Sequence, residues 1–173
     1  LGSKLDIKQF AALNKKCLFN QNIPFDLSVK KSRFELNEHS DKGEIPQTVI
    51  GQGNTLMTPF HNALLMCAVA NDGVLMKPYV IDHIEGADNT TVKENIPEIY
   101  ADLMSKKDAK KLQKMLSEVV TDGTGYSLDT DLYTAAGKTG TAENEGKYAH
   151  AWFVGYSNVE DPDLVVCVLV ENT

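Results

Sequence analysis

Three β-forming runs close the sequence, and only short turns separate them. Residues 132–143, 149–156 and 164–171 carry β-branched and aromatic side chains, with Asn144 and Gly146 in the first turn and Pro162 in the second. Strands with such short connections pair antiparallel, because a parallel pair needs a crossover of a dozen or more residues. The sequence therefore predicts a three-stranded antiparallel meander.

The clearest helix signal lies upstream of these strands. Thr58 is a good N-cap, and Pro59 fits the first helical position because its missing N–H has no partner there in any case. Residues 60–70 are apolar on nearly all sides, which is typical of a buried helix, and Gly73 follows as a stop.

Two further helices are predicted. Ser105 with Asp108 resembles a capping box, and the apolar stripe that follows runs to about residue 121. Residues 4–18 read as an amphipathic helix that Ser3 could cap.

The remaining segments have no clear period. Residues 20–52 are predicted to be a long connection, and residues 74–84 an extended segment that Pro78 interrupts. The predicted fold class is therefore α+β, with a mainly helical and loop part over residues 1–125 and antiparallel strands over residues 132–171.

Composition excludes several classes of function. The net charge of −7 argues against a nucleic-acid partner, and no apolar run, residues 164–170 included, is long enough to span a bilayer. Cys17, Cys67 and Cys167 have no metal-binding spacing, and the apolar surroundings of the last two predict buried structural thiols. No metal and no cofactor are expected. Five lysines between residues 106 and 114 are interpreted as a solvated helix face.

The first predicted strand contains a candidate ligand-binding tetrapeptide, Lys138-Thr139-Gly140-Thr141. Side chains alternate along a strand, so a ligand that touches all four residues must lie along the open edge of the strand. The ammonium attracts a carboxylate, the hydroxyls can donate to it, and the Thr141 amide can point at a developing oxyanion. The alternative is a solvent-facing Lys-Thr turn without a ligand.

The surroundings of this tetrapeptide resemble the penicillin-binding protein transpeptidases. The local sequence is closer to the class B, monofunctional enzymes than to class A or to β-lactamases, since it reads A-G-K-T-G-T-A-E followed by H-A-W-F-V-G-Y. The resemblance covers residues 1–173 in the family's order, and its other segments are Gly51-Gln52-Gly53, Thr58-Pro59, residues 70–73 and residues 122–125.

The resemblance implies a D,D-transpeptidase parent that cross-links peptidoglycan through an acyl-serine intermediate and binds β-lactams. Lys138, Thr139, Gly140 and Thr141 would bind the D-Ala-D-Ala end of a stem peptide, with Lys138 and Thr141 acting in catalysis. Such a parent would be anchored to the bacterial cytoplasmic membrane, with this domain on the extracytoplasmic side and a membrane glycan polymerase as a partner.

Three other residues are further candidates for the site. Glu143 could orient Lys138 or the loop that follows it. His150 could contact a ligand, although a lone histidine more often packs or forms hydrogen bonds. Trp152 and Phe153 alternate on their strand, and core packing is the expected role for both.

The family's S-x-x-K and S-x-N motifs are not found in their expected places. Residues 28–31 match S-x-x-K, but in an irregular polar stretch, and residues 156–158 resemble a Y-x-N variant on the wrong side of K-T-G. We interpret both as chance matches. The sequence is thus expected to be roughly the C-terminal half of a transpeptidase domain, beginning after S-x-N, soluble and inactive by itself.

The last strand has an expected structural consequence. Residues 164–170 are uncharged and β-rich, and they would form an exposed sheet edge that pairs with a second copy or is covered by local rearrangement. Two other functions remain open at this point. One is a class D-like serine β-lactamase or β-lactam sensor domain, and the other is a non-catalytic binding or scaffold protein.

Overall fold

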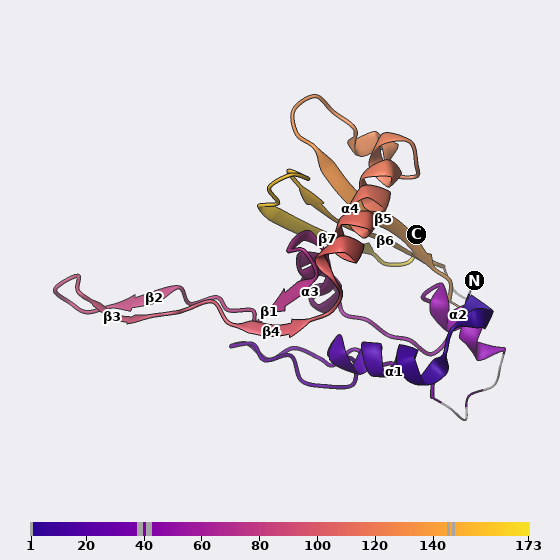
Figure 1. Cartoon of the computed structure of the whole chain (residues 1–173), viewed down its shortest axis with the longest axis horizontal. Coiled ribbons are helices and arrows are strands. Elements are labelled where there is room, and N and C mark those ends of the chain that lie inside the picture. The colour runs from indigo at the N-terminus through magenta and orange to yellow at the C-terminus, as the bar shows by residue number, and fades with distance from the viewer. Residues whose placement is uncertain (1, 38–39, 41–42, 145, 147) are drawn as a thin grey trace.

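The computed structural model describes residues 2–37, 40, 43–144, 146 and 148–173 of the chain. Its central feature is a sheet of β5 (Ala135–Ala142), β6 (His150–Ser157) and β7 (Leu164–Val170), in that order and antiparallel (Figure 1). This confirms the predicted meander and the α+β fold class.

Two helices pack on one face of this sheet, α3 (Pro59–Ala70) and α4 (Lys106–Thr121). Both begin where the caps predicted. Thr58 Oγ1 accepts the His61 N–H, and Ser105 Oγ accepts the Asp108 N–H. The core between the helices and the sheet contains Met66, Leu116, Ala136, Val154 and Tyr156. Burial of this apolar face holds β5 against α4.

The N-terminal part differs from the prediction. The helix α1 (Ile7–Lys16) begins three residues later than expected, and Asp6 caps it by accepting the Gln9 N–H. A 3₁₀ turn, η1 (Gly2–Lys4), precedes it, and the side chain of Ser3 lies outside the described part. An aspartate is as good an N-cap as a serine, so the local signals alone did not decide between them.

The connection over residues 20–52 has structure of its own. It contains α2 (Glu44–Val49), and its Phe34, Leu36 and Ile45 are buried together with Phe19. A second 3₁₀ turn, η2 (Tyr126–Leu128), follows α4.

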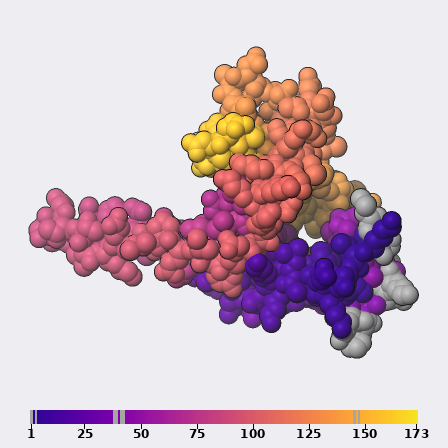
Figure 2. Space-filling model, viewed as in Figure 1, coloured from indigo at the N-terminus to yellow at the C-terminus, as the bar shows by residue number. Residues whose placement is uncertain are grey.

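A two-stranded arm projects from the body (Figures 1 and 2). β1 (Val74–Met76) pairs with β4 (Ile99–Asp102) at its base, and β2 (His83–Glu85) pairs with β3 (Thr91–Glu94) further out. Gly73 makes the base of the arm possible, because its φ is +93° and a Cβ there would lie 2.6 Å from the Met104 carbonyl oxygen. The sequence predicted only the extended course of residues 74–84, so the return strands β3 and β4 are new.

The thiol prediction was wrong for one residue. Cys67 is exposed, on the side of α3 that faces a cavity, whereas Cys17 and Cys167 are half-buried. Among the described helices, none is both long and apolar enough to cross a bilayer.

Candidate functional site

The register of β5 decides which of its backbone groups face outward. Asn158 N–H donates to the Thr134 carbonyl oxygen across the β5–β6 pair, so even-numbered residues of this strand point their backbone groups toward β6. The backbone groups of Thr139 and Thr141 therefore point to the opposite, outer edge. Both the carbonyl and the N–H of Thr141 are directed there, as an oxyanion-binding amide requires.

Lys138 brings positive charge to this outer edge. Its side chain is exposed, and Nζ donates to the Thr139 carbonyl oxygen at 2.8 Å and lies 3.5 Å from Thr139 Oγ1. The Thr139 hydroxyl is also 2.6 Å from Thr124 Oγ1, in the turn that follows α4. The structure thus places an ammonium and a hydroxyl pair beside an outward-facing backbone.

Gln52 reaches the same edge from a distant part of the chain. Its Nε2 donates to the Thr141 carbonyl oxygen at 3.2 Å. The Gly51-Gln52-Gly53 segment contributed to the family resemblance, but no feature of the sequence placed Gln52 at the strand. A contact between residues 89 positions apart leaves no local signal in the sequence.

Gly140 and Trp152 are neighbours across the β5–β6 pair. Gly140 is exposed, and a Cβ there would lie 3.5 Å from Trp152 Cβ. Trp152 is half-buried on the face that carries Val154 and the helices. Phe153 lies on the opposite face.

The other two candidates have different surroundings. His150 is half-buried at the start of β6, where its Nδ1 accepts the Asn172 N–H at 3.1 Å. Glu143 is exposed just after β5, and within the described residues no contact joins it to Lys138. The structure places Lys138, Thr139, Gly140 and Thr141 on one strand, and Glu143 lies just beyond the end of that strand.

The two chance motif matches have unsuitable positions for catalysis. Ser28 lies outside every described helix, so the segment 28–31 does not present a serine and a lysine on one helical turn. Tyr156 is only 3% exposed, and burial raises the pKa of its hydroxyl to about 12. A buried hydroxyl that stays protonated is a poor proton acceptor for a substrate.

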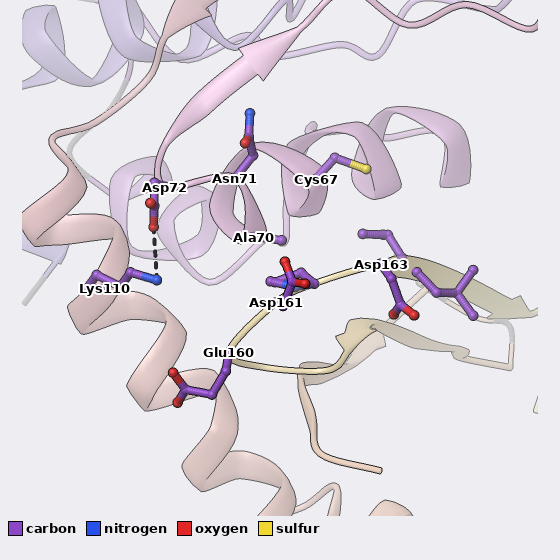
Figure 3. A pocket seen from close by; sticks show the side chains of 11 residues that line it. Cys67, Ala70, Asn71, Asp72, Lys110, Glu160, Asp161 and Asp163 are labelled. Carbon is purple, nitrogen blue, oxygen red and sulfur yellow. Dashed lines mark ion pairs between the residues drawn. The ribbon is translucent and has the colours of Figure 1, made fainter. Parts of the chain in front are cut away.

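Two cavities of the described structure lie away from this strand edge. One of about 390 Å³ opens between the end of α3, α4 and the turn that leads into β7, with Asp72 and Lys110 on one side and Glu160, Asp161 and Asp163 on the other (Figure 3). A second, of about 750 Å³, lies between Lys16 and the start of α4. Neither of these two cavities is lined by residues 138–141.

Asp72 organises the charges in the first cavity. Its carboxylate is 2.7 Å from Lys106 Nζ and 3.1 Å from Lys110 Nζ. Hydrogen bonds from these two ammonium groups lower the pKa of Asp72 to about 2. Two of the lysines interpreted as a solvated face therefore join α4 to the end of α3.

A comparison with family models matches residues 1–173 to the penicillin-binding protein transpeptidase domain. Peptidoglycan D,D-transpeptidase PbpA of Mycolicibacterium smegmatis is 32% identical over 138 residues, which are 76% of this chain and 28% of that protein. The chain thus spans little more than a quarter of this curated relative.

Two solved structures are also similar. The D,D-transpeptidase domain of a peptidoglycan glycosyltransferase from Eggerthella lenta has a TM-score of 0.91 and 29% identity, over 99% of this chain and 45% of that one. The imipenem acyl-enzyme complex of penicillin-binding protein A from M. tuberculosis has a TM-score of 0.83 and 26% identity, over 93% of this chain and 37% of that one.

Proposed function

The chain belongs to the penicillin-binding protein transpeptidase domain family, and from that premise we propose that its parent protein is a peptidoglycan D,D-transpeptidase. In the proposed reaction a serine hydroxyl attacks the carbonyl of the penultimate D-alanine of a stem peptide. The peptide bond breaks and D-alanine leaves with the proton. The acyl group then passes from the serine to an amine of a neighbouring stem peptide, and the proton that the amine loses restores the serine hydroxyl.

The outer edge of β5 is the observation that carries this proposal. An extended peptide can add to this edge as a strand, since the backbone groups of Thr139 and Thr141 face outward. The Lys138 ammonium and the hydroxyls of Thr139 and Thr141 would hold the terminal carboxylate. The Thr141 N–H would donate to the oxyanion as the tetrahedral intermediate forms.

β-Lactam binding is part of the same proposal. The relative from M. tuberculosis has been solved as an imipenem acyl-enzyme, and its fold matches 93% of the present chain. A β-lactam carries a ring carbonyl and a carboxylate at a separation similar to that of a D-Ala-D-Ala end. It would therefore use the Lys138 and Thr139 side of the edge for its carboxylate.

The nucleophile is proposed to come from outside these 173 residues. S-x-N does not occur in the sequence, and the single S-x-x-K match, residues 28–31, lies in irregular chain. We therefore expect the parent protein to be acylated and this chain by itself to remain unlabelled.

Fluorescent penicillin tests both halves of that expectation. The parent protein should retain one dye per molecule after denaturing electrophoresis, and the 173-residue chain should retain none. Labelling of the isolated chain would show that its own residues include a nucleophile. Rapid release of hydrolysed penicillin by the parent would instead indicate a serine β-lactamase, and no labelling of the parent would favour a non-catalytic binding protein.

Location and partners follow from the same activity. The stem peptide lies outside the cytoplasmic membrane, so we propose that a membrane anchor elsewhere in the parent holds this domain there, near a membrane glycan polymerase.

Self-association is proposed for the isolated chain, through β7. Leu164, Val166, Val168 and Val170 are 41–57% exposed, and β7 has a partner strand on only one side in the described sheet.

A further inference from the structure

Two successive outward-facing carbonyls of β5 already have side-chain donors. Lys138 Nζ donates to the Thr139 carbonyl oxygen, and Gln52 Nε2 donates to the Thr141 carbonyl oxygen. We infer that Gln52 is a specificity-determining residue, whose side-chain amide occupies the Thr141 carbonyl until a ligand amide displaces it. This inference rests on the proposed function of the β5 edge.

Backbone hydrogen bonds to α2 hold the turn that contains Gln52 in place. The Gln52 N–H donates to the Gln47 carbonyl oxygen at 2.9 Å, and the Gly51 N–H donates to the Thr48 carbonyl oxygen at 3.0 Å, so this turn is anchored on the end of α2. Gly51 and Gly53 have φ values of +82° and +77°, a region that residues with a Cβ rarely adopt. The turn between these two glycines directs Gln52 toward β5.

The Thr141 carbonyl is the acceptor that an added strand would need. A strand that pairs with the outer edge of β5 donates its N–H groups to the outward carbonyls and accepts from the outward N–H groups. A ligand with an amide N–H beside its reactive carbonyl would therefore compete with the Gln52 amide for the outward side of the Thr141 carbonyl. The exchange replaces one N–H···O bond by another, so the ligand gains less than it would at an unoccupied carbonyl.

The Gln52 amide should therefore discriminate between ligands. A ligand that needs the Thr141 carbonyl must displace Gln52, whereas a ligand without an amide N–H at that position leaves the contact intact. Lys138 does not contribute to this difference, because a carboxylate is common to both kinds of ligand and its own contact is with Thr139.

Two β-lactams with the same penam ring skeleton, one of them oxidised at sulfur, test the inference on the parent protein. Penicillin G has an acylamino group with an N–H beside the ring carbonyl, and sulbactam has only hydrogen there. Acylation rates would be measured for penicillin G directly and for sulbactam by competition with fluorescent penicillin. Gln52→Met retains the side-chain length without the donor, and Gln52→Ala removes the side chain.

Both variants should raise the second-order acylation rate of penicillin G relative to sulbactam, by about fivefold, which corresponds to one neutral hydrogen bond. Gln9→Ala is the matched control, because Gln9 is an exposed glutamine on α1 that has no contact with the Gln52 turn in the described structure. It should leave the ratio of the two rates unchanged.

An unchanged ratio in both Gln52 variants, or a fall in the penicillin G rate relative to sulbactam, would overturn the inference. This includes the case in which both acylation rates change by the same factor, which would indicate a structural role for Gln52. If the wild-type parent reacts with neither compound, the proposed function itself fails. Melting temperatures of the variants separate these outcomes from misfolding, and an exposed contact such as this one should leave them nearly unchanged.

Discussion

β5 and β7 are the two outer strands of one described sheet, yet their free edges differ in kind. β5 carries Lys138, Gly140 and two threonines, and side-chain donors occupy its outward carbonyls at Thr139 and Thr141. β7 consists of the seven residues Leu164–Val170, all apolar, and its alternate side chains are 41–57% exposed.

The difference separates an edge that can bind a ligand from one that needs a cover. Polar donors on an edge can exchange for a ligand and return to their carbonyls when it leaves, which suits a turnover site. An apolar, uncharged edge lacks such donors and gains most from pairing with another strand. Substitutions on the two edges and in the helices that support them test that contrast, beginning with the largest effect.

Lys138→Ala on β5 should lower the acylation rate of the parent protein by about 100-fold, because the ligand carboxylate loses a charge-assisted hydrogen bond. Stopped-flow measurements with fluorescent penicillin would give the rate. Lys114→Ala, which removes an exposed lysine from α4, is the charge control and should leave the rate unchanged. A loss of less than about threefold in Lys138→Ala would remove β5 from the proposed site.

Gln113→Ala should destabilise the contact between α3 and α4, the two helices that pack on the sheet of β5 and β7. Gln113 is 3% exposed on α4, and its Nε2 donates to the Val69 carbonyl oxygen at 2.7 Å and to the Ala70 carbonyl oxygen at 3.3 Å. It thereby satisfies carbonyls at the end of α3 that the helix itself leaves unpaired. The free energy of unfolding should fall by about 2 kcal/mol.

Urea unfolding of the 173-residue chain would measure that loss. Gln47→Ala, at an exposed position on α2, should change the free energy of unfolding by less than about 0.5 kcal/mol. Equal effects of the two substitutions would mean that the buried amide does not stabilise the α3–α4 contact.

Val168→Lys should weaken association through β7. Val168 is 44% exposed, and an antiparallel pair of two such edges would bring the new charges close to each other. The dissociation constant of the self-associated chain should rise by about tenfold, the effect of roughly 1.4 kcal/mol of repulsion. Sedimentation equilibrium would measure it, with Val168→Thr as the uncharged β-branched control.

A wild-type chain that stays monomeric at high concentration would contradict the association proposal directly. In the parent protein Val168→Lys should leave the ratio of penicillin G to sulbactam acylation rates unchanged. The β7 edge would then be separate from ligand selection at β5.

Asp72→Asn should give the smallest effect, and one that depends on pH. The folded-state pKa of Asp72 is lowered from 3.8 to about 2 by Lys106 and Lys110, so its ion pairs stabilise the fold above pH 3.8. This contribution is lost as the pH falls through 2. Because the pairs are near the surface, the difference in unfolding free energy at neutral pH should be about 1 kcal/mol.

Urea titrations of wild type and Asp72→Asn between neutral pH and pH 2 would follow that difference. Asparagine also tolerates the left-handed conformation, with φ at +53°, that Asp72 adopts, so the substitution changes mainly the charge. A difference that persists at the acid end would show that the two lysines are not its cause.

Much of the body was predictable because its signals are local. The caps Thr58 and Ser105 lie within three residues of the N–H groups that they accept, and both helices begin where the sequence indicates. The short turns before and after β6 predicted the meander for the same reason. Ser3 was wrong as the cap of α1, since Asp6 offers the same chemistry closer to the helix.

The rest depends on contacts between distant segments. No periodic pattern in the sequence indicates that β3 pairs with β2 and β4 with β1. The same holds for the exposure of Cys67 and for the Gln113 contacts with α3. Of the candidate site, the sequence predicted the tetrapeptide from Lys138 to Thr141 but not the residues that meet its edge. Thr124 and Gln52 reach β5 from 15 and 89 residues away.

The amino-acid sequence by itself determined where the principal helices start, that three strands follow one another, and which of them carries an ammonium and hydroxyls. These properties arise from hydrogen bonds and side-chain alternation over a few residues. Only the tertiary structure decided that the Thr141 carbonyl faces outward and that Gln52 occupies it. That contact exists because the fold brings the turn after α2 to the edge of β5, and packing of distant segments is a property of the whole chain.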